Sequence, residues 1–488
     1  MLADWAYLAA ITLTPMPRFQ IPLTGRLTDT RLVAGKQCAV NMYPHSKTGY
    51  RQFPGMVEFA AKGTAAYRGG AVMGGIPYVI WGTSLNSIAS NGTITVISGT
   101  VSGTGMLVVD TDGTQLVMTG GSVKMLYTVA GGLASITDGD LGDAYSNAYL
   151  DNTFYYENSN GRIFASSLGD ASAIAALDFI TSESFTDGVT RLYALNQLLY
   201  SFGTQTTEVY YTSGTGNTRL SRQVVLEHGI LGRFAVDSID DSIYLMDATR
   251  RLTRLQGGQR IPISVPGLGE ELDGYSTVSD CTVSCYTINQ ENFIEITFPT
   301  EDKSWVVHER SGEAVKREDW NNSRSRAAGY LRAYGKLIAA DHSSGQLFDF
   351  SAATFQDNAT DVERALHSEL VTSELLGVPS RPYLLNAIYL DYDSSSGFLT
   401  TDAGVILTTD TDEPLSDTNV ALSVNVSISK DGRGNFFSTP RAVTVADNGT
   451  LRLPNWGKCQ DTIIRVSTSS DTNASFVGLA VDLELLDN

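Results

Sequence analysis

The chain has 488 residues, of which 42% are apolar, so it can bury the cores of two or three domains. Its 53 acidic and 34 basic residues give a formal net charge of −19, which argues against wrapping nucleic acid, because that task needs a basic footprint. No stretch is long and apolar enough to span a bilayer, and residues 2–14 lack the basic start of a signal peptide, so we expect neither membrane insertion nor export.

Residues 1–55 are predicted to form an extended N-terminal arm that leads into the first repeat. Five prolines in this segment oppose both helix and central strand. Apolar positions in residues 16–45 follow no clear period, so the arm is not expected to form a core of its own. Its cations are Arg18, Arg26, Arg31 and Lys36. We expect these four to meet the carboxylates of a partner that orders the arm; the alternative is a disordered or loosely adherent tail.

From about residue 72 to residue 351 one unit recurs: an apolar, aromatic-rich strand, a tight polar turn, a second apolar strand and a Gly/Ser/Thr-rich connection. Its strongest strands are residues 76–81, 115–118, 153–156, 197–200, 242–246, 292–296 and 336–340. Turn dipeptides such as Asn91-Gly92, Asp112-Gly113 and Asn160-Gly161 take the positive φ of tight hairpins. Short strands that return every roughly 38 to 50 residues predict a β-propeller of six or seven blades over residues 56–355.

The pattern changes near residue 360. Residues 361–376 fit an amphipathic helix, but residues 365–371 equally fit an alternating strand, and periodicity alone does not decide. Clear strands follow at residues 387–391, 424–428, 463–466 and 478–481. They predict a C-terminal β-sandwich over residues 356–488, and the predicted fold class is therefore all-β.

Residues that could carry catalysis or a cofactor are few. The five histidines include no pair at zinc-ligand spacing, and the chain has neither a nucleophile elbow nor a phosphate-binding glycine loop. Asp341-His342-Ser343 has the residue types of a catalytic triad, but sequence neighbours do not form one. We predict that the protein is not an enzyme and holds no cofactor.

Acidic segments and cysteines also favour plain structural roles. Residues 110–113, 138–143 and 391–397 are rich in aspartate, but their length or glycine position departs from a calcium loop, so solvated turns are favoured over metal sites. Cys281 and Cys285 lack the second cysteine pair of a zinc site. We predict that both are free thiols in a reducing compartment.

Basic residues cluster in two groups within the propeller region. The first is Arg250, Arg251, Arg254 and Arg260, and the second is Arg317, Arg324 and Arg326. If these arginines faced phosphate groups, they could bind DNA. In so acidic a chain, an interface with a subunit or partner is favoured, with a solvated blade edge as the alternative.

Four stretches of the chain carry a family resemblance. Residues 40–44 and 50–55 place an Asn-aromatic turn before a Pro-Gly; residues 293–320 place a Trp-containing strand after a short polar turn; the others are residues 334–347, and residues 429–432 through 455–457 to 464–466. In this order and spacing they resemble the tail hub, or nozzle, proteins of short-tailed bacteriophages, also called packaged-DNA stabilisation proteins. Arg433 departs from the pattern, because a second glycine or a serine is commoner there.

This resemblance implies a structural virion protein of the tail, assembled in the host cytoplasm. It implies a ring, usually of six copies, below the portal and its adaptor ring, which extends the channel, helps to retain packaged dsDNA and forms the conduit for ejection. Further implied partners are a tailspike or tail fibre and a tail needle or plug. The arm cations would meet the adaptor ring or a neighbouring hub subunit. A net charge of −19 fits a lining that repels phosphates without sequence-specific binding.

Two rival functions belong to other classes. One is a β-propeller glycan-binding or glycan-hydrolysing surface protein of a phage particle, and the other is a monomeric propeller adhesin. A hydrolase would need carboxylates that converge at one mouth of the propeller. The oligomeric state separates the readings, because a ring supports the hub and a monomer supports either rival.

Overall fold

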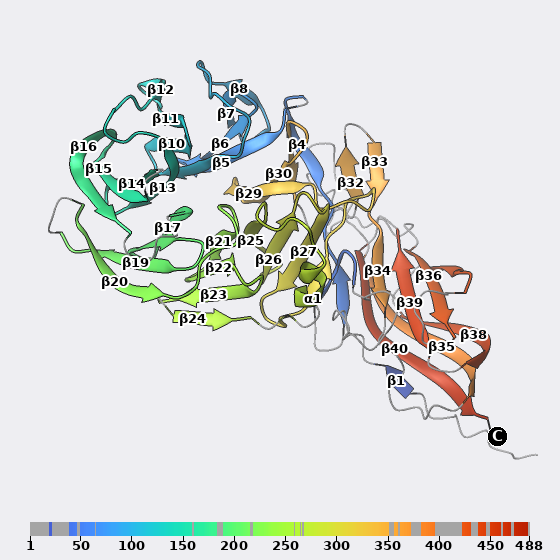
Figure 1. Cartoon of the computed structure of the whole chain (residues 1–488). Coiled ribbons are helices and arrows are strands. Elements are labelled where there is room, and N and C mark those ends of the chain that lie inside the picture. The colour runs from blue at the N-terminus through green and yellow to red at the C-terminus, as the bar shows by residue number, and fades with distance from the viewer. Residues whose placement is uncertain are drawn as a thin grey trace, which may run out of the picture. The chain divides into compact units, whose positions relative to one another are not determined.

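The protein is described here from a computed structural model, in which the chain divides into two compact units (Figure 1). One unit is continuous, Phe53–His367, and is called the propeller unit; the other joins the two chain ends, Met1–Gln52 and Ser368–Asn488, and is called the sandwich unit. The described residues are 19–21, 39–45, 49–63, 65–158, 161–182, 189–214, 218–257, 259–263, 265, 268–350, 356–359, 362–371, 382–395, 422–430, 438–445, 449–459, 462–469 and 473–486.

The propeller unit contains seven four-stranded antiparallel sheets within the described residues. Blades 1 to 3 are built from β5 (Tyr67–Met73), β6 (Ile76–Trp81), β7 (Ser84–Ile88) and β8 (Ile94–Val96); β9 (Val108–Thr111), β10 (Gln115–Gly120), β11 (Val123–Thr128) and β12 (Gly132–Ser135); and β13 (Ala144–Leu150), β14 (Thr153–Asn158), β15 (Arg162–Ser167) and β16 (Asp170–Thr181). Each blade thus uses four strands that are consecutive in the chain.

Blades 4 to 6 repeat this order, and blade 7 departs from it. Their strands are β17 (Arg191–Leu195), β18 (Leu198–Phe202), β19 (Thr207–Thr212) and β20 (Leu220–Leu226); β21 (Val236–Ile239), β22 (Ser242–Met246), β23 (Leu252–Gln256) and β24 (Gln259–Pro262); and β25 (Thr282–Ile288), β26 (Glu291–Phe298), β27 (Lys303–His308) and β28 (Ala314–Lys316). Helix α1 (Leu268–Asp273) precedes blade 6 in the chain. Blade 7 combines β29 (Ala327–Ala333), β30 (Lys336–Asp341) and β31 (Gln346–Asp349) with β4 (Val57–Ala61) from the start of the unit.

Strand β4 closes the ring of blades, because it pairs with β31 at the other end of the unit, with Ala60 opposite Leu347. The hairpin β32 (Gln356–Ala359) and β33 (Val362–Ala365) follows blade 7. The prediction of a β-propeller is confirmed, and the seven strongest predicted strands each supply the second strand of one blade, β6, β10, β14, β18, β22, β26 and β30.

Tight turns and two-sided burial explain why these segments form blades. In blade 3 the turn residues Asp151 and Asn152 have φ of 48° and 60°, and in blade 6 Asn289 and Gln290 have φ of 51° and 66°. Positive φ at both central residues gives hairpins whose twist matches that of the flanking strands. Second strands such as β14 and β22 are buried along their whole length, because blades cover both of their faces, so their sequences read as continuous apolar runs.

The cores of the propeller unit lie between neighbouring blades. Tyr78 and Leu116 belong to a cluster between blades 1 and 2, and Phe154 belongs to one between blades 2 and 3. Trp81 of blade 1 and Leu347 of blade 7 share a cluster across the seam where the ring closes. Each blade therefore depends on its neighbours for burial.

The described residues of the sandwich unit form two sheets. One has the order β2 (Met42–Pro44), β3 (Tyr50–Gln52), β40 (Asn473–Leu485), β35 (Tyr383–Ser395), β38 (Gly449–Cys459), with β1 (Phe19–Ile21) also on β40; the other has the order β34 (Ser368–Val371), β39 (Ile463–Thr468), β36 (Leu422–Ser429), β37 (Arg441–Val445). The hydroxyl of Tyr383 in β35 donates to Thr462 Oγ1 at 2.6 Å, and Lys430 donates to the Trp456 carbonyl of β38 at 2.8 Å, so polar contacts tie the two sheets together. Residues 368–371 form a strand, which resolves the helix-or-strand ambiguity of that segment.

Where the structure describes the predicted N-terminal arm, residues 1–55, its residues contribute strands to the sandwich unit. β1 pairs with β40, with Phe19 opposite Val481, and β3 also pairs with β40, with Tyr50 opposite Phe476. These short strands extend the sheet that contains β40, which comes from the far end of the chain. The unit boundaries fall at 53 and 367, compared with the predicted 56 and 355.

Candidate functional site

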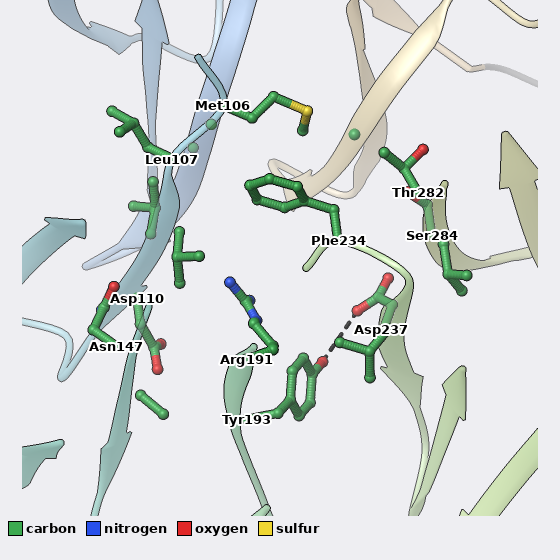
Figure 2. Close-up of a pocket in the computed structure, with 18 of the residues that line it drawn as sticks. Met106, Leu107, Asp110, Asn147, Arg191, Tyr193, Phe234, Asp237, Thr282 and Ser284 are labelled. Carbon is green, nitrogen blue, oxygen red and sulfur yellow. Dashed lines mark hydrogen bonds between the residues drawn. The ribbon is translucent and has the colours of Figure 1, made fainter. Parts of the chain in front are cut away.

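The innermost strands of all seven blades surround a cavity of about 310 Å³ on the propeller axis (Figure 2). Its polar lining includes Asp110 of β9, Asn147 of β13, Arg191 and Tyr193 of β17 and Asp237 of β21. Loop residues such as Phe234 add apolar surface. The cavity is thus a small polar chamber inside one copy of the chain.

Two glycines in β5 allow close packing of this strand against β6 and against Leu107. A Cβ on Gly70 would lie 2.6 Å from the Tyr78 carbonyl oxygen, and one on Gly69, whose φ is +154°, would lie 2.9 Å from the Leu107 carbonyl oxygen. A larger residue would therefore push β5 away from β6 or from Leu107.

Arg191 projects into the middle of this chamber (Figure 2). Within the described residues its guanidinium makes no hydrogen bond or ion pair, and its Nε and Nη1 are buried without a partner. Its cation–π neighbour is the Tyr193 ring, 5.9 Å from Cζ to the ring centroid. Burial lowers the pKa of Arg191, an effect that the charges of Tyr193, Asp110 and Asp237 oppose.

The two cavity carboxylates each bind the backbone of the next blade. Asp110 accepts the Tyr149 N–H at 2.7 Å, and Asp237 accepts the Cys285 N–H at 2.7 Å. Asp237 also accepts the Tyr193 hydroxyl at 3.1 Å, the bond drawn in Figure 2. Burial raises the pKa of both carboxyls, while these backbone hydrogen bonds lower it. Both aspartates therefore tie neighbouring blades together.

The predicted basic groups are mostly engaged inside the propeller unit. Arg260 pairs with Asp247 at 2.7 Å, Arg254 donates to Ser242 at 2.9 Å, and Arg250 donates to the Leu272 carbonyl at 2.6 Å. In the second group, Arg317 is buried and donates to the Pro54 carbonyl at 3.1 Å, and Arg326 pairs with Asp341. These contacts hold most of the predicted basic residues to other parts of the propeller unit, whereas Arg251 is exposed.

The remaining predicted residues have varied outcomes. Arg18, Arg26, Arg31 and Lys36 lie outside the described residues, so a partner interface there stays a prediction. Cys281 and Cys285 are free thiols, as predicted. Asp341 accepts the Ser343 N–H at 2.8 Å and so caps a turn. The described part of the chain holds no group of three or more His, Cys, Asp and Glu suited to a metal ion.

No motif in the sequence points directly to the Arg191 chamber. Its polar residues are separated by about one blade each along the chain, and each sits in a strand that also carries apolar residues. Superposing the first strands of the repeats would have placed Asp110, Arg191 and Asp237 around one axis.

The fold and its axial chamber define a seven-bladed β-propeller protein joined to a β-sandwich. A family model, Phage_stabilise, described as "Bacteriophage P22 Gp10, beta-propeller", matches residues 19–354. The chain belongs to this family, whose members are bacteriophage structural proteins that stabilise packaged DNA. No helix among the described residues has the length and apolar character needed to cross a membrane.

Other comparisons show only remote likeness. No curated protein matches the chain. A chain from the "Crystal Structure of Mitotic Checkpoint Complex" is 12% identical, with a TM-score of 0.41, over 66% of this chain and 99% of that one. PorZ, a surface component of the type-IX secretion system of Porphyromonas gingivalis, is 9% identical, with a TM-score of 0.36, over 65% of this chain and 43% of that one. Neither likeness carries an argument about function.

Proposed function

We propose that the protein forms a hexameric tail hub, or nozzle, that extends the portal–adaptor channel, helps to retain the packaged dsDNA and serves as the conduit for its ejection. The observation that carries this proposal, beside family membership, is the size of the axial chamber. At about 310 Å³ it holds the volume of roughly ten water molecules, and Arg191 projects into it. A DNA duplex cannot pass along the axis of one propeller, so a conduit requires several copies around a shared channel.

The charge of the chain supports a channel through which DNA passes without binding. Each copy carries a net charge of −19, and the arginines of the two basic groups mostly bond within the propeller unit. Attractive side chains along a channel would bind the DNA backbone and slow its movement, whereas an acidic lining repels it.

The remaining partners follow from the family resemblance and from the N-terminal cations. The hub would lie in the virion tail, contact the head-to-tail adaptor ring, carry a tailspike or tail fibre and hold a tail needle or plug. Assembly would take place in the host cytoplasm. Arg18, Arg26, Arg31 and Lys36 would meet carboxylates of the adaptor ring or of a neighbouring hub subunit.

Native mass spectrometry and electron microscopy of the purified full chain test the oligomer. We expect a species of six times 52.5 kDa and a ring with an open centre. Particles assembled without the protein should package DNA and then lose it. A stable monomer at all concentrations, together with particles that retain their DNA, would contradict the proposal and favour a glycan-binding surface protein.

The role of the cations is tested by replacing all four of Arg18, Arg26, Arg31 and Lys36 with serine, which keeps the described strands intact. The matched control replaces four cations of the propeller unit, Arg162, Arg251, Arg310 and Arg332, with serine; all four are exposed. We expect the first variant to form rings that no longer attach to particles, and the control to attach normally. Equal attachment of both variants would rule out the arm cations as the contact.

A further inference from the structure

The guanidinium of Arg191 lacks an acceptor. Arginine stays charged in proteins and offers five N–H donors, yet within the described residues none of its donors has a partner. Nη2 is not among the buried nitrogens, so it is the part of the side chain that reaches the open space of the chamber. A charged group without acceptors is costly to bury, so a molecule from outside the chain must supply them.

The charges around Arg191 restrict the chemistry of that molecule. One guanidinium and the carboxylates of Asp110 and Asp237 line the same chamber, a formal balance of −1. Neither carboxylate forms an ion pair with Arg191, so there is room between them for a bridging atom. An anion offers only acceptors and would face two carboxylates. A hydroxyl group accepts from the guanidinium and donates to a carboxylate, so it satisfies both sides.

The rest of the lining fits a compact ligand with polar edges and apolar faces. Asn147 is 1% exposed, accepts the Thr119 hydroxyl at 2.7 Å, and leaves its Nδ2 without a partner. The rings of Phe234 and Tyr193 add apolar surface near Arg191 (Figure 2). A volume of about 310 Å³ stands at the lower end of small-molecule sites, which limits the occupant to one small unit.

We propose that the axial chamber binds one small, neutral, polyhydroxylated molecule, such as a single sugar residue or a polyol, whose hydroxyl groups bridge Arg191 to Asp110 and Asp237. Binding at this site does not depend on ring formation or on DNA retention, so the proposal is tested independently of the proposed tail hub. The proposal concerns binding only, because both carboxylates also tie the blades together.

Saturation-transfer NMR on the full chain tests the site, with D-glucose, D-galactose, N-acetyl-D-glucosamine and sorbitol as separate probes. We expect at least one neutral probe to bind, and its Kd to rise by about tenfold or more in Arg191→Met, which keeps an unbranched side chain but removes every donor. Arg332→Met, on an exposed arginine in a second cavity lined by Tyr334 and Lys336, is the matched control and should bind like the unmodified chain.

A crystal structure of the unmodified chain soaked in the bound probe keeps the proposal testable if Arg191→Met does not fold. Electron density for the probe beside Arg191 supports the site. Ordered water alone in the chamber, or acetate or phosphate binding in place of every neutral probe, overturns it. Binding of a free sugar identifies a soluble ligand, whereas binding only of oligosaccharides with that sugar at one end identifies a glycan terminus.

Discussion

The two units of this chain complete their β-sheets in opposite ways. In the propeller unit, six of the seven blades use four consecutive strands, and a single long-range pairing, β4 on β31, closes the ring. In the sandwich unit the largest sheet is assembled from both ends of the chain, with β1 and β3 pairing with β40. Because the strands of a blade pair locally, the sequence pattern that predicts a blade lies within about 45 residues. Pairing between the two chain ends has no such local pattern, so the sequence does not show which strands pair.

The two units also differ in the polar groups that they bury. In the propeller unit, ionisable side chains form ties between blades, such as Asp110 to the Tyr149 N–H, and within a blade, such as the buried pair of Arg326 and Asp341 in blade 7. Between the sheets of the sandwich unit the ties include the Tyr383 hydroxyl on Thr462. The propeller unit should therefore be the more sensitive of the two to pH and to single charge changes.

The largest effect should come from removing residues 473–488. This deletion takes away β40, which pairs with β1, β3 and β35, so the sheet splits into fragments with no common neighbour. We expect the sandwich unit to unfold while the propeller unit, whose blades do not use β40, keeps its own melting transition. Differential scanning calorimetry and limited proteolysis distinguish the two units.

The control for that deletion removes residues 487 and 488 alone and should leave both transitions in place. Loss of the propeller transition in the larger deletion would show that the two units fold only together. That result would remove the contrast between local and end-to-end assembly.

The next effect concerns blade 7, in which β4 closes the ring of blades. Arg326 donates to Asp341 through Nε at 3.0 Å and to Gln346 at 3.0 Å, and its guanidinium lies 4.2 Å from the centroid of the Phe348 ring. Arg326→Ala leaves the Asp341 carboxylate buried without its cation, so we expect a loss of about 3–5 kcal/mol in the free energy of unfolding of the propeller unit. Chemical denaturation followed by tryptophan fluorescence measures it. Arg332→Ala, on an exposed side chain, should change stability by less than about 0.5 kcal/mol.

The pair of Arg326 and Asp341 also predicts how acid changes the stability of the propeller unit. Burial alone would raise the pKa of Asp341, but Arg326 and the hydrogen bonds from Ser343 outweigh it and hold that pKa below its usual value of 3.8. The folded state therefore binds the proton less tightly than the unfolded state, and the stabilisation is present above about pH 4 and lost as the pH falls further. A stability difference between the unmodified chain and Asp341→Asn that does not shrink in acid would contradict this assignment.

The blades are easier to predict from the sequence than the site or the sandwich unit. Buried second strands and left-handed turns are encoded in short stretches, so the seven strongest strands were found and the propeller was predicted. The pairing of Phe19 with Val481 joins residues at opposite ends of the chain, and no period relates them. The position of Arg191 in a chamber cannot be predicted from its own strand, because the chamber forms only when the first strands of all seven blades surround one axis.

A smaller and opposite pH effect is expected from Glu157 in β14. Its side chain is 3% exposed and its Oε2 has no partner; burial raises its pKa to about 8, with Arg233 acting in the other direction. The folded state holds a proton that the unfolded state has released, so stability should fall by about 2–3 kcal/mol between about pH 6 and about pH 8. Glu157→Gln should remove that fall. A variant with the same pH profile of thermal unfolding as the unmodified chain would show that Glu157 is already ionised in the folded state.

The smallest expected effect on stability comes from replacing a glutamine by glycine, and its sign should differ between a turn and a strand of the propeller unit. Gln197 has a φ of 62° in the hairpin between β17 and β18, a backbone conformation that costs a side-chain-bearing residue roughly 1–2 kcal/mol. Gln197→Gly should therefore stabilise the propeller unit, by about 0.5–1 kcal/mol once the greater freedom of glycine in the unfolded chain is subtracted. The matched control is Gln223→Gly, at an exposed position inside strand β20, where the same change should destabilise by about 0.5–1 kcal/mol. The midpoints of urea unfolding report both, and the opposite signs are the result to look for, because a general effect of removing a glutamine side chain would move both midpoints the same way. If Gln197→Gly also destabilises, the turn side chain contributes a contact worth more than the backbone conformation that it imposes.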